Sequence, residues 1–272
     1  MKKLLLATLL SLSSAMTLAN AVDPFAEVKT LLQSNDHTGA FKALEKVAKT
    51  NHPDALYNLG YLTEIGQGTA QNNKKAVQYY EKAAKQGSSI ANFVLAKSYE
   101  TGRLGLKANA KKAQTYLEAA DRLGSAEAQI EIAEQLFAKH NAQSNQEALN
   151  KLAPLVKQGH VGAGYAQATF YINDGFRQKN VPQVQQGLNE LHALGQKGHV
   201  ASLLLLGNLY ATGSLVKQDL PKAKTIFTAL DQAKVPEAKP ALTIINKALA
   251  AQAEQKMPEP KKVTSKTTNK KA

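Results

Sequence analysis

The chain has 272 residues, a formal net charge of +13 and no cysteine. The lack of cysteine excludes disulfides, zinc sites with thiolate ligands and cysteine nucleophiles. Much of the charge lies outside the part expected to fold: without Lys2, Lys3 and residues 256–272 the remainder carries +6. A balance of this size is weak support for nucleic-acid binding, so we expect no nucleic-acid partner.

Residues 1–21 have the pattern of a secretory signal peptide. Two lysines precede a short apolar run at residues 4–12, and an A-x-A cleavage site ends at Ala21. The apolar run is too short to span a bilayer comfortably, which argues against stable membrane insertion. No cysteine follows it, which argues against a lipoprotein. We therefore expect cleavage after Ala21 and a periplasmic or secreted product of a bacterium.

Residues 22–51 are predicted to form a capping pair of helices. Asp23 and the proline after it are a helix-start signal, and the first helix should run to about Gln33. After a short polar turn, residues 39–49 carry apolar side chains at the spacing of a second helix. Terminal units of repeat proteins usually depart from the repeat pattern, so this pair is interpreted as the N-terminal cap.

A helix–turn–helix unit over residues 54–87 recurs along the chain. Small and apolar residues share one face of each helix, and Gly87 ends the unit as a C-cap glycine does. Equivalent glycines follow at Gly124, Gly159 and Gly198, with spacings of 37, 35 and 39 residues. A period of this size is typical of an α-solenoid, in which each unit needs neighbours to bury its faces. We predict an all-α solenoid of about five repeats over residues 52–235.

The third and fourth repeats fit this pattern least well. Pro154 falls inside the second helix of the third repeat, where proline should bend the helix or remove a hydrogen bond. Gly162 and Gly164 are expected to weaken the first helix of the fourth repeat. Val181 and the proline after it should restart its second helix.

Two further segments follow the repeats. Residues 236–255 are predicted to form a C-terminal capping helix, with apolar residues at helical spacing. Residues 256–272 are rich in lysine, proline and threonine and have little to bury, so we expect a disordered tail. The tail either attracts anionic partners or only keeps the protein soluble, and the sequence leaves both interpretations open.

The repeats share a two-part motif: A-x-x-x-L-G-x-x-Y-x-x-G-x-G, then D-x-x-K-A-x-x-W/Y-Y-x-K-A-A-x-x-G. The first repeat carries it at Ala55, Leu59, Gly60, Gly66, Gly68, Ala76, Tyr79, Tyr80, Lys82, Ala83, Ala84 and Gly87, and departs from it at Thr63 and Asn72. The fifth carries it at Leu206, Gly207, Tyr210, Gly213, Asp219, Lys222 and Ala223. This motif resembles that of the Sel-one-like repeats, over roughly residues 52–235.

The resemblance implies a right-handed superhelix of helix pairs. Members of that family mostly work as scaffolds or adaptors in secretion, envelope assembly, signalling or host contact. Others are immunity proteins that bind a toxic effector in the periplasm. Some secreted members resemble β-lactam-binding proteins, but the paired cysteines of those members are absent here. A fold does not by itself fix a function, so these remain expectations.

The sequence offers no catalytic constellation. It has no nucleophile elbow, H-E-x-x-H, Walker or dinucleotide-binding motif. His52, His160 and His199 occupy one column of the repeats, where other repeats have Ser88 and Ser125. A serine there predicts a helix N-cap, and one repeat step exceeds the distance at which two ligands share a metal. We therefore predict no enzyme activity, metal or cofactor.

Candidate binding residues follow from the geometry of the first helices. At 100° per residue, the motif positions fall on one packed arc, and the positions −1, +3, +6 and +10 from the leading alanine fall opposite. In superhelical repeat proteins the first helices line the concave surface, so these positions should face a groove. We call them the first-helix stripe. Its candidate partner-binding members are Asp54, Asn58, Tyr61, Ile90, Val94, Lys97, Glu127, Glu131, Glu134, Leu205 and Asn208.

The stripe combines an acidic cluster with apolar side chains. Glu127, Glu131 and Glu134 share one helix face, where like charges destabilise a helix by about a few tenths of a kcal/mol. They are expected to receive Arg or Lys from a partner, or else to be a solvated face paired with Lys97. The apolar members supply contact area or pack against neighbouring turns: Tyr61, Ile90, Val94 and Leu205. The two asparagines, Asn58 and Asn208, are expected to hydrogen-bond a ligand backbone.

These features predict a monomeric, exported scaffold that binds a protein or peptide in the groove of the solenoid. One alternative is a periplasmic immunity protein, which binds a single toxic partner very tightly. A second alternative, from another class, is a weak β-lactam-binding protein or hydrolase. The absence of a nucleophile–base pair argues against the second alternative.

Overall fold

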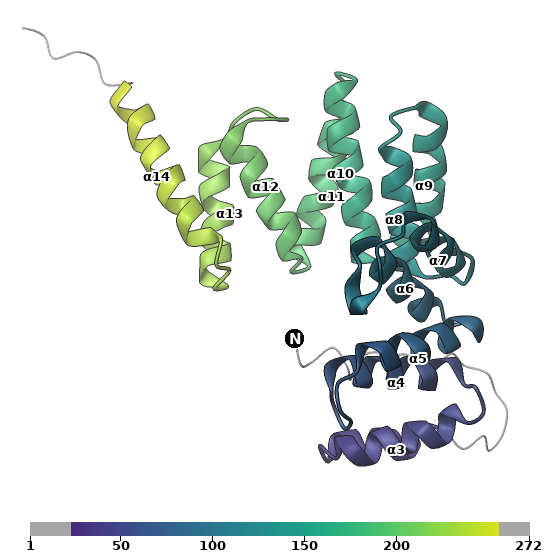
Figure 1. Ribbon diagram of the computed structural model, residues 1–272. Coiled ribbons are helices and arrows are strands. Elements are labelled where there is room, and N and C mark those ends of the chain that lie inside the picture. Colours follow the sequence, from purple (N-terminus) through teal and green to yellow (C-terminus); the bar gives the residue numbers. More distant parts are fainter. Residues whose placement is uncertain (1–22, 256–272) are drawn as a thin grey trace, which may run out of the picture. The chain divides into compact units, whose positions relative to one another are not determined.

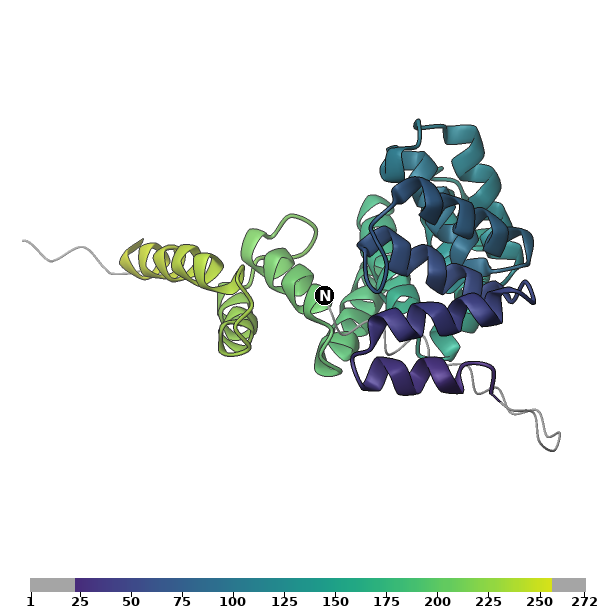
Figure 2. The ribbon, with the colours of Figure 1, turned by 60° about the horizontal axis from the view of Figure 1, so that its bottom comes forward.

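A computed structural model describes residues 23–255. The predicted signal peptide and the predicted Lys-rich tail lie outside the described residues. Every regular element within them is a helix, and the fold is that of an all-α solenoid, as the repeats predict (Figures 1 and 2). The chain divides into two compact units between Gln135 and Leu136, and each unit is described by itself.

The first unit stacks helices that are neighbours in the sequence. Each of the helices from α2 to α6 packs against the next one in the chain. The helices are α2 (Ala26–Gln33), α3 (His37–Ala48), α4 (Pro53–Ile65), α5 (Asn73–Lys85), α6 (Ser89–Thr101), the short 3-10 helix η1 (Arg103–Gly105), α7 (Ala110–Arg122) and α8 (Ala126–Phe137). The last two residues of α8 fall in the second unit.

The second unit continues in the same way. Its helices follow one another in chain order, and each packs against the next from α9 to α14 (Figure 1). They are α9 (Ala142–Lys157), α10 (Val161–Arg177), α11 (Val181–Gln196), α12 (Val200–Thr212), α13 (Leu220–Gln232) and α14 (Ala238–Gln255). The last helix begins at Ala238, two residues after the start of the range 236–255 predicted for the C-terminal capping helix.

Side-chain caps alternate between two types along the solenoid. Second helices begin after an Asx residue whose side-chain oxygen accepts a backbone N–H three residues on: Asp36, Asn72, Asn109, Asn141, Asn180 and Asp219. First helices begin after serine or histidine. Ser88 and Ser125 accept from Ala91 N and Ala128 N at 3.2 Å, as predicted for this column. Each cap satisfies an N–H group that a helix start would otherwise leave unpaired.

The two helices of a repeat lock together at one pair of positions. A Cβ on Gly60 would lie 2.8 Å from Tyr80 Cδ1, and one on Gly207 would lie 2.7 Å from Phe227 Cε2. Glycine therefore lets an aromatic ring lie against the helix backbone. In the second repeat the two equivalent positions are occupied by Ala96 and by a buried leucine, Leu117, which belong to one core cluster. The motif glycine of the first helix and the motif aromatic of the second are thus one structural unit.

The turn between the helices is also repeated. Gly66 and Gly213 end α4 and α12 in the left-handed region, with φ of 69° and 68°. A backbone hydrogen bond then closes each turn, from Asn72 N to Thr63 O and from Asp219 N to Tyr210 O, both at 2.9 Å. The left-handed conformation suits glycine because it lacks a Cβ. The first and fifth repeats therefore have the same turn although other residues of their loops differ.

The irregular repeats keep the helical hairpin by other means. As predicted, Pro154 lies inside a helix, and α9 runs through it to Lys157. The expected weakening by Gly162 and Gly164 does not interrupt α10, which is continuous over 17 residues. A Cβ on Gly187 of α11 would lie only 2.5 Å from the backbone oxygen of Ala168. Close packing against α11 therefore offsets the low helix propensity of the glycines in α10.

Candidate partner-binding surface

An ion pair joins the stripe of two adjacent first helices. Lys97 Nζ on α6 lies 3.2 Å from Glu131 Oε1 on α8, and Lys97 also pairs with Glu100 one turn further along α6. Burial acts to lower the pKa of Lys97, but the hydrogen bonds to Glu100 and Glu131 outweigh it and raise the pKa. The stripe positions of the second and third repeats are therefore neighbours, and Lys97 stays positively charged.

The acidic cluster on α8 is only partly neutralised. Ser125 Oγ donates to Glu127 Oε2 at 3.1 Å, and Lys97 neutralises Glu131. Glu134 is exposed, and no side chain of the described residues forms a hydrogen bond or ion pair with it. Burial of part of its surface raises the pKa of Glu134, with a further rise from Glu131 and an opposing effect of Lys97. Glu134 is the carboxylate of this cluster that a cation would stabilise most.

The apolar members of the stripe divide into packed and exposed side chains. Tyr61 packs against the core formed by α2, α3 and α4, and Val94 packs against the core of α5 and α6. Ile90 is 39% exposed and Ile65, at the end of α4, is 43% exposed. Tyr61 and Val94 thus support the surface, and Ile90 is the predicted apolar contact that remains accessible.

The structure corrects the expectation for Asn58. This residue is 7% exposed, and its Nδ2 donates to the backbone oxygen of Asp54 at 2.8 Å. Its amide is engaged within α4, so it does not offer a hydrogen bond to a ligand. The assignment of faces at 100° per residue fails here because α4 is covered by α3 as well as by α5. The buried face of α4 is therefore wider than the motif positions alone. Asp54 itself is half-buried at the start of the helix.

Two stripe residues belong to the second unit. Leu205 packs against the core cluster of α10, α11 and α12, so it is a supporting side chain. Asn208 is exposed, and its backbone oxygen accepts from Thr212 Oγ1 at 2.8 Å. The exposure of Asn208 is compatible with a hydrogen bond to a ligand, which stays a prediction, while the surface of the first unit is defined by α4, α6 and α8.

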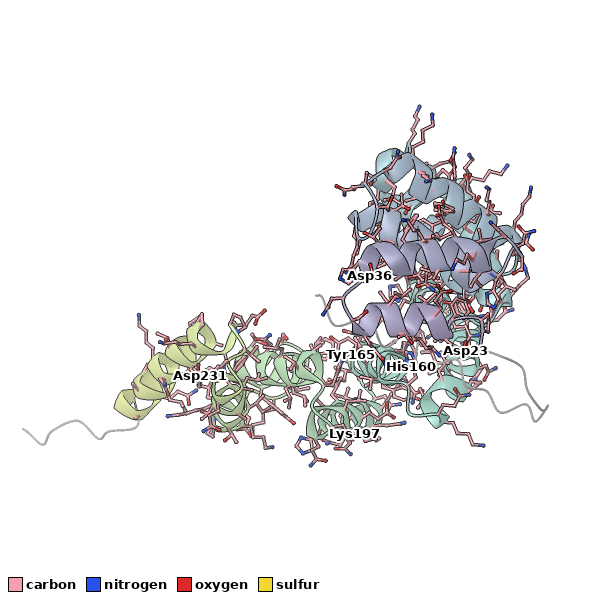
Figure 3. The ribbon with its side chains drawn as sticks, turned by 90° about the horizontal axis from the view of Figure 1, so that it is seen from below. Asp23, Asp36, His160, Tyr165, Lys197 and Asp231 are labelled. Atoms are coloured by element: carbon pink, nitrogen blue, oxygen red, sulfur yellow. The ribbon has the colours of Figure 1, made fainter. Side chains whose placement is uncertain are left out.

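The histidine column has a structural role. His52 Nδ1 accepts from Asp54 N and His160 Nδ1 accepts from Ala163 N, both at 3.3 Å, so each caps a first helix (Figure 3 labels His160). His199 also precedes a first helix, but its Nδ1 lies 2.8 Å from Ser202 Oγ. Within residues 23–255 no group of three or more His, Cys, Asp or Glu side chains could hold a metal ion.

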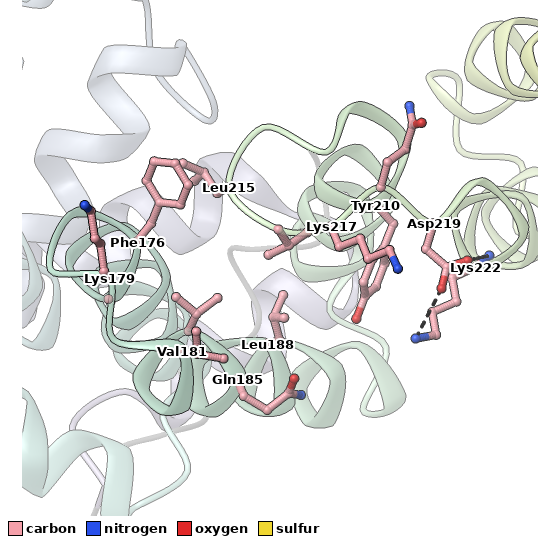
Figure 4. Close-up of a pocket in the computed structure, with 14 residues that line it drawn as sticks. Phe176, Lys179, Val181, Gln185, Leu188, Tyr210, Leu215, Lys217, Asp219 and Lys222 are labelled. Carbon is pink, nitrogen blue, oxygen red and sulfur yellow. Dashed lines mark hydrogen bonds and ion pairs between the residues drawn. The ribbon is translucent and has the colours of Figure 1, made fainter.

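The sequence did not reveal a groove in the second unit. Its lining comes from the α10–α11 turn, the start of α11 and the loop between α12 and α13 (Figure 4). Its cavity volume is about 660 Å³. Phe176 and Val181 were the available signal for this groove. They are large apolar residues beside a turn, at positions for which the repeat motif gives no structural role, and both are exposed.

Stacked helical hairpins with caps and turns of one type define a repeat protein of the α-solenoid class. The Sel1 repeat model matches residues 53–88, 89–125 and 200–227, which are the first, second and fifth repeats. The resemblance found in the sequence is thereby confirmed: the chain contains three Sel1 repeats. Such repeats are scaffolds that are typically non-catalytic and generally act in protein–protein interaction.

Solved structures show the same fold. The chain is 20% identical to a Sel1 repeat protein from Oxalobacter formigenes, with a TM-score of 0.63, 84% of this chain covered and 98% of that chain. It is 22% identical to a protective antigen of uropathogenic Escherichia coli strains that displays an SLR fold, with a TM-score of 0.64 and 86% of this chain covered. The match spans 51% of that antigen.

A search of curated proteins gave no match. Within the described part of the chain, no helix is both long enough and apolar enough to span a membrane.

Proposed function

We propose that this protein is an exported scaffold that binds a protein partner through the first-helix stripe of its first unit. The observation that carries the proposal is the acidic cluster of α8, with Glu134 unpaired and Ile90 exposed on the neighbouring first helix. A cluster of carboxylates with an adjacent apolar contact suits a partner that presents Arg or Lys beside an apolar side chain. Export is supported by the signal-peptide pattern of residues 1–21.

The proposed recognition uses charge for register and apolar area for affinity. A partner guanidinium would approach Glu134 and the outer oxygen of Glu131, which Lys97 holds in place. Lys97 has a second role. Its positive charge lies between Glu100 and Glu131, so it repels a partner whose cations are in the wrong register. Ile90 would contact the apolar part of the partner.

An immunity protein is the narrow form of this function, with one toxic partner bound very tightly. A broad adaptor would retain several proteins, whereas an immunity protein would retain one. The same capture experiment therefore separates the two forms.

The test is affinity capture from an extract of the producing cell with the mature chain as bait. Glu131→Lys together with Glu134→Lys should abolish capture of the specifically retained protein, with helicity by circular dichroism unchanged, because both side chains lie on the helix surface. The matched control is Glu81→Lys together with Glu118→Lys, which makes the same change in charge on two exposed positions of second helices. Equal capture by both double variants would contradict the proposal.

A further inference from the structure

The groove of the second unit is built by two close turns. A Cβ on Gly175, near the end of α10, would lie 2.9 Å from Val184 N, so the start of α11 passes very close to α10. The turn between them places Lys179 in the left-handed region with φ of 54°. On the other side, Gly213 ends α12 in the left-handed region and starts the loop that carries residues 215–219. Both walls are therefore fixed by backbone geometry.

The floor and walls of the groove are apolar. Phe176 is 51% exposed and Val181 is 74% exposed, and they face the groove with the buried Leu188 between its walls (Figure 4). Leu215 and Tyr210 line the opposite wall and rest on the core cluster of α10, α11 and α12. A space of about 660 Å³ is large enough for one or two bulky side chains of a ligand. Exposed large apolar residues around such a space are typical of a binding groove.

The rim of the groove is basic. Lys222 Nζ lies 3.3 Å from Asp219 Oδ2 and 5.3 Å from the centre of the Tyr210 ring, so this cation already has partners. The side chains of Lys179 and Lys217 are exposed on opposite walls, and neither side chain forms a hydrogen bond or ion pair with another described residue (Figure 4). The carboxylate of Asp219 also accepts the backbone N–H of Lys222 at 3.0 Å. The free charges at the rim are therefore positive.

We propose that this groove binds a segment of a partner protein in which a bulky apolar side chain stands next to Asp or Glu. The apolar side chain would enter between Phe176 and Leu188, and the carboxylates would reach Lys179 and Lys217. The chain's own ends do not have this chemistry: residues 256–272 contain six lysines and one glutamate, and residues 1–22 contain two lysines and no acidic residue. Charge complementarity thus selects an acidic–apolar segment of another protein.

This site is separate from the surface of the proposed function. It lies wholly within the second unit, uses none of the stripe residues, and has the opposite charge preference. A partner that presents cations to α8 and a partner that presents carboxylates to this groove are distinct ligands. Failure of one proposal therefore leaves the other standing.

The test measures binding of labelled peptides to the mature chain by fluorescence anisotropy. Three probes are compared: a peptide with Phe and Leu between four glutamates, the same peptide with lysines for the glutamates, and the acidic peptide with Ser and Gly for Phe and Leu. Saturable binding should be seen for the first probe and should be at least about tenfold weaker for the other two, because the groove requires both chemistries.

Variants then locate the site. Lys179→Glu together with Lys217→Glu, and separately Phe176→Ser, should each weaken binding of the first probe by about tenfold or more. Two controls should leave it unchanged: Lys224→Glu together with Lys239→Glu, at exposed positions outside the groove, and Ile244→Ser, an apolar residue that is 70% exposed on α14. All changed residues are on the surface, so circular dichroism should show an unaltered fold.

Three results would overturn the proposal. The first is no saturable binding of the acidic–apolar probe, and the second is equal loss in the groove variants and their controls. The third is a dimer in sedimentation that Phe176→Ser dissociates, because the groove would then be an interface between two copies of the chain. The Glu131→Lys, Glu134→Lys variant should bind the probe like the unchanged chain, which keeps this test independent of the proposed function.

Discussion

Glu134 illustrates how a single residue can work against stability on a binding surface. Its carboxylate is partly desolvated and lies near Glu131, so the pKa of Glu134 is raised, while Lys97 offsets only part of the effect. A group of this kind is stabilised when a partner brings a cation. Residues that lower stability but improve binding are common on functional surfaces.

Replacing this carboxylate gives a prediction with a definite sign. Because the pKa of Glu134 is raised in the folded state, its contribution to stability is present below the ordinary value of 4.5 and is lost as the pH rises through the raised value. Glu134→Gln should therefore increase the free energy of unfolding at pH 7 by about a few tenths of a kcal/mol, with no gain near pH 3.5.

Urea unfolding at the two pH values measures this difference. Glu118→Gln is the matched control, since Glu118 is an exposed glutamate on α7, away from the cluster. A Glu134→Gln chain that is less stable than the unchanged chain at pH 7 would show that the carboxylate is held by favourable contacts.

At the scale of the element, the helical hairpin depends on a glycine and an aromatic ring that meet across it. Gly60 of α4 leaves room for the ring of Tyr80, and Tyr80 Oη donates to Glu64 Oε2 at 2.7 Å. Burial, followed by the hydrogen bond to Glu64, raises the pKa of Tyr80, so its hydroxyl stays protonated as a donor. Arg103 Nη2 lies 3.4 Å from the other oxygen of Glu64, which ties the hairpin to the next repeat.

A double-mutant cycle tests this pairing. Gly60→Ala should lower the free energy of unfolding by about 1–3 kcal/mol, because the new methyl group overlaps the Tyr80 ring. Gly60→Ala with Tyr80→Leu should cost clearly less than the sum of the two single changes, since Ala96 and Leu117 fill the same positions in the second repeat. Urea denaturation of the four chains gives the coupling. Additive effects would mean that glycine is not needed for the ring.

At the scale of the whole molecule, stability should be distributed over two units. Within each unit, helices that are neighbours in the sequence pack together, and the described chain divides into the two units between Gln135 and Leu136. In solenoids of this kind, stability is approximately a sum of local terms, so damage in one place is expected to act over a limited range.

Phe227→Ala provides the test of this range. Phe227 is 1% exposed in the core that α13 shares with α14, and removing a buried phenyl ring costs about 3–5 kcal/mol. Hydrogen exchange followed by mass spectrometry should show faster exchange in α12 to α14 and unchanged exchange in α4 to α6. Equal acceleration along the whole chain would instead show that both units unfold together.

The sequence by itself determined the repeats, because their signals are local. A glycine that ends a helix, an Asx or Ser cap and a small residue opposite an aromatic ring each act within one hairpin, so the pattern of residues 53–125 and 200–227 is readable without coordinates. The caps at Asn141 and Asn180 preserve the hairpin where the motif fades. The alternative pairing of Lys97 with the acidic cluster was also readable, since both positions fall on the same stripe.

Only the tertiary structure decided which stripe residues are accessible. Burial depends on how many neighbouring helices cover an element, and the angular position of a residue on its own helix does not give that number. Asn58 is buried and Ile90 is exposed, although both belong to the stripe. The groove beside Phe176 was equally hidden, because its walls come from a turn and a loop about forty residues apart that meet only when two hairpins stack. Local interactions determined the helical hairpins of this protein, and the packing of the hairpins determined which surfaces are accessible.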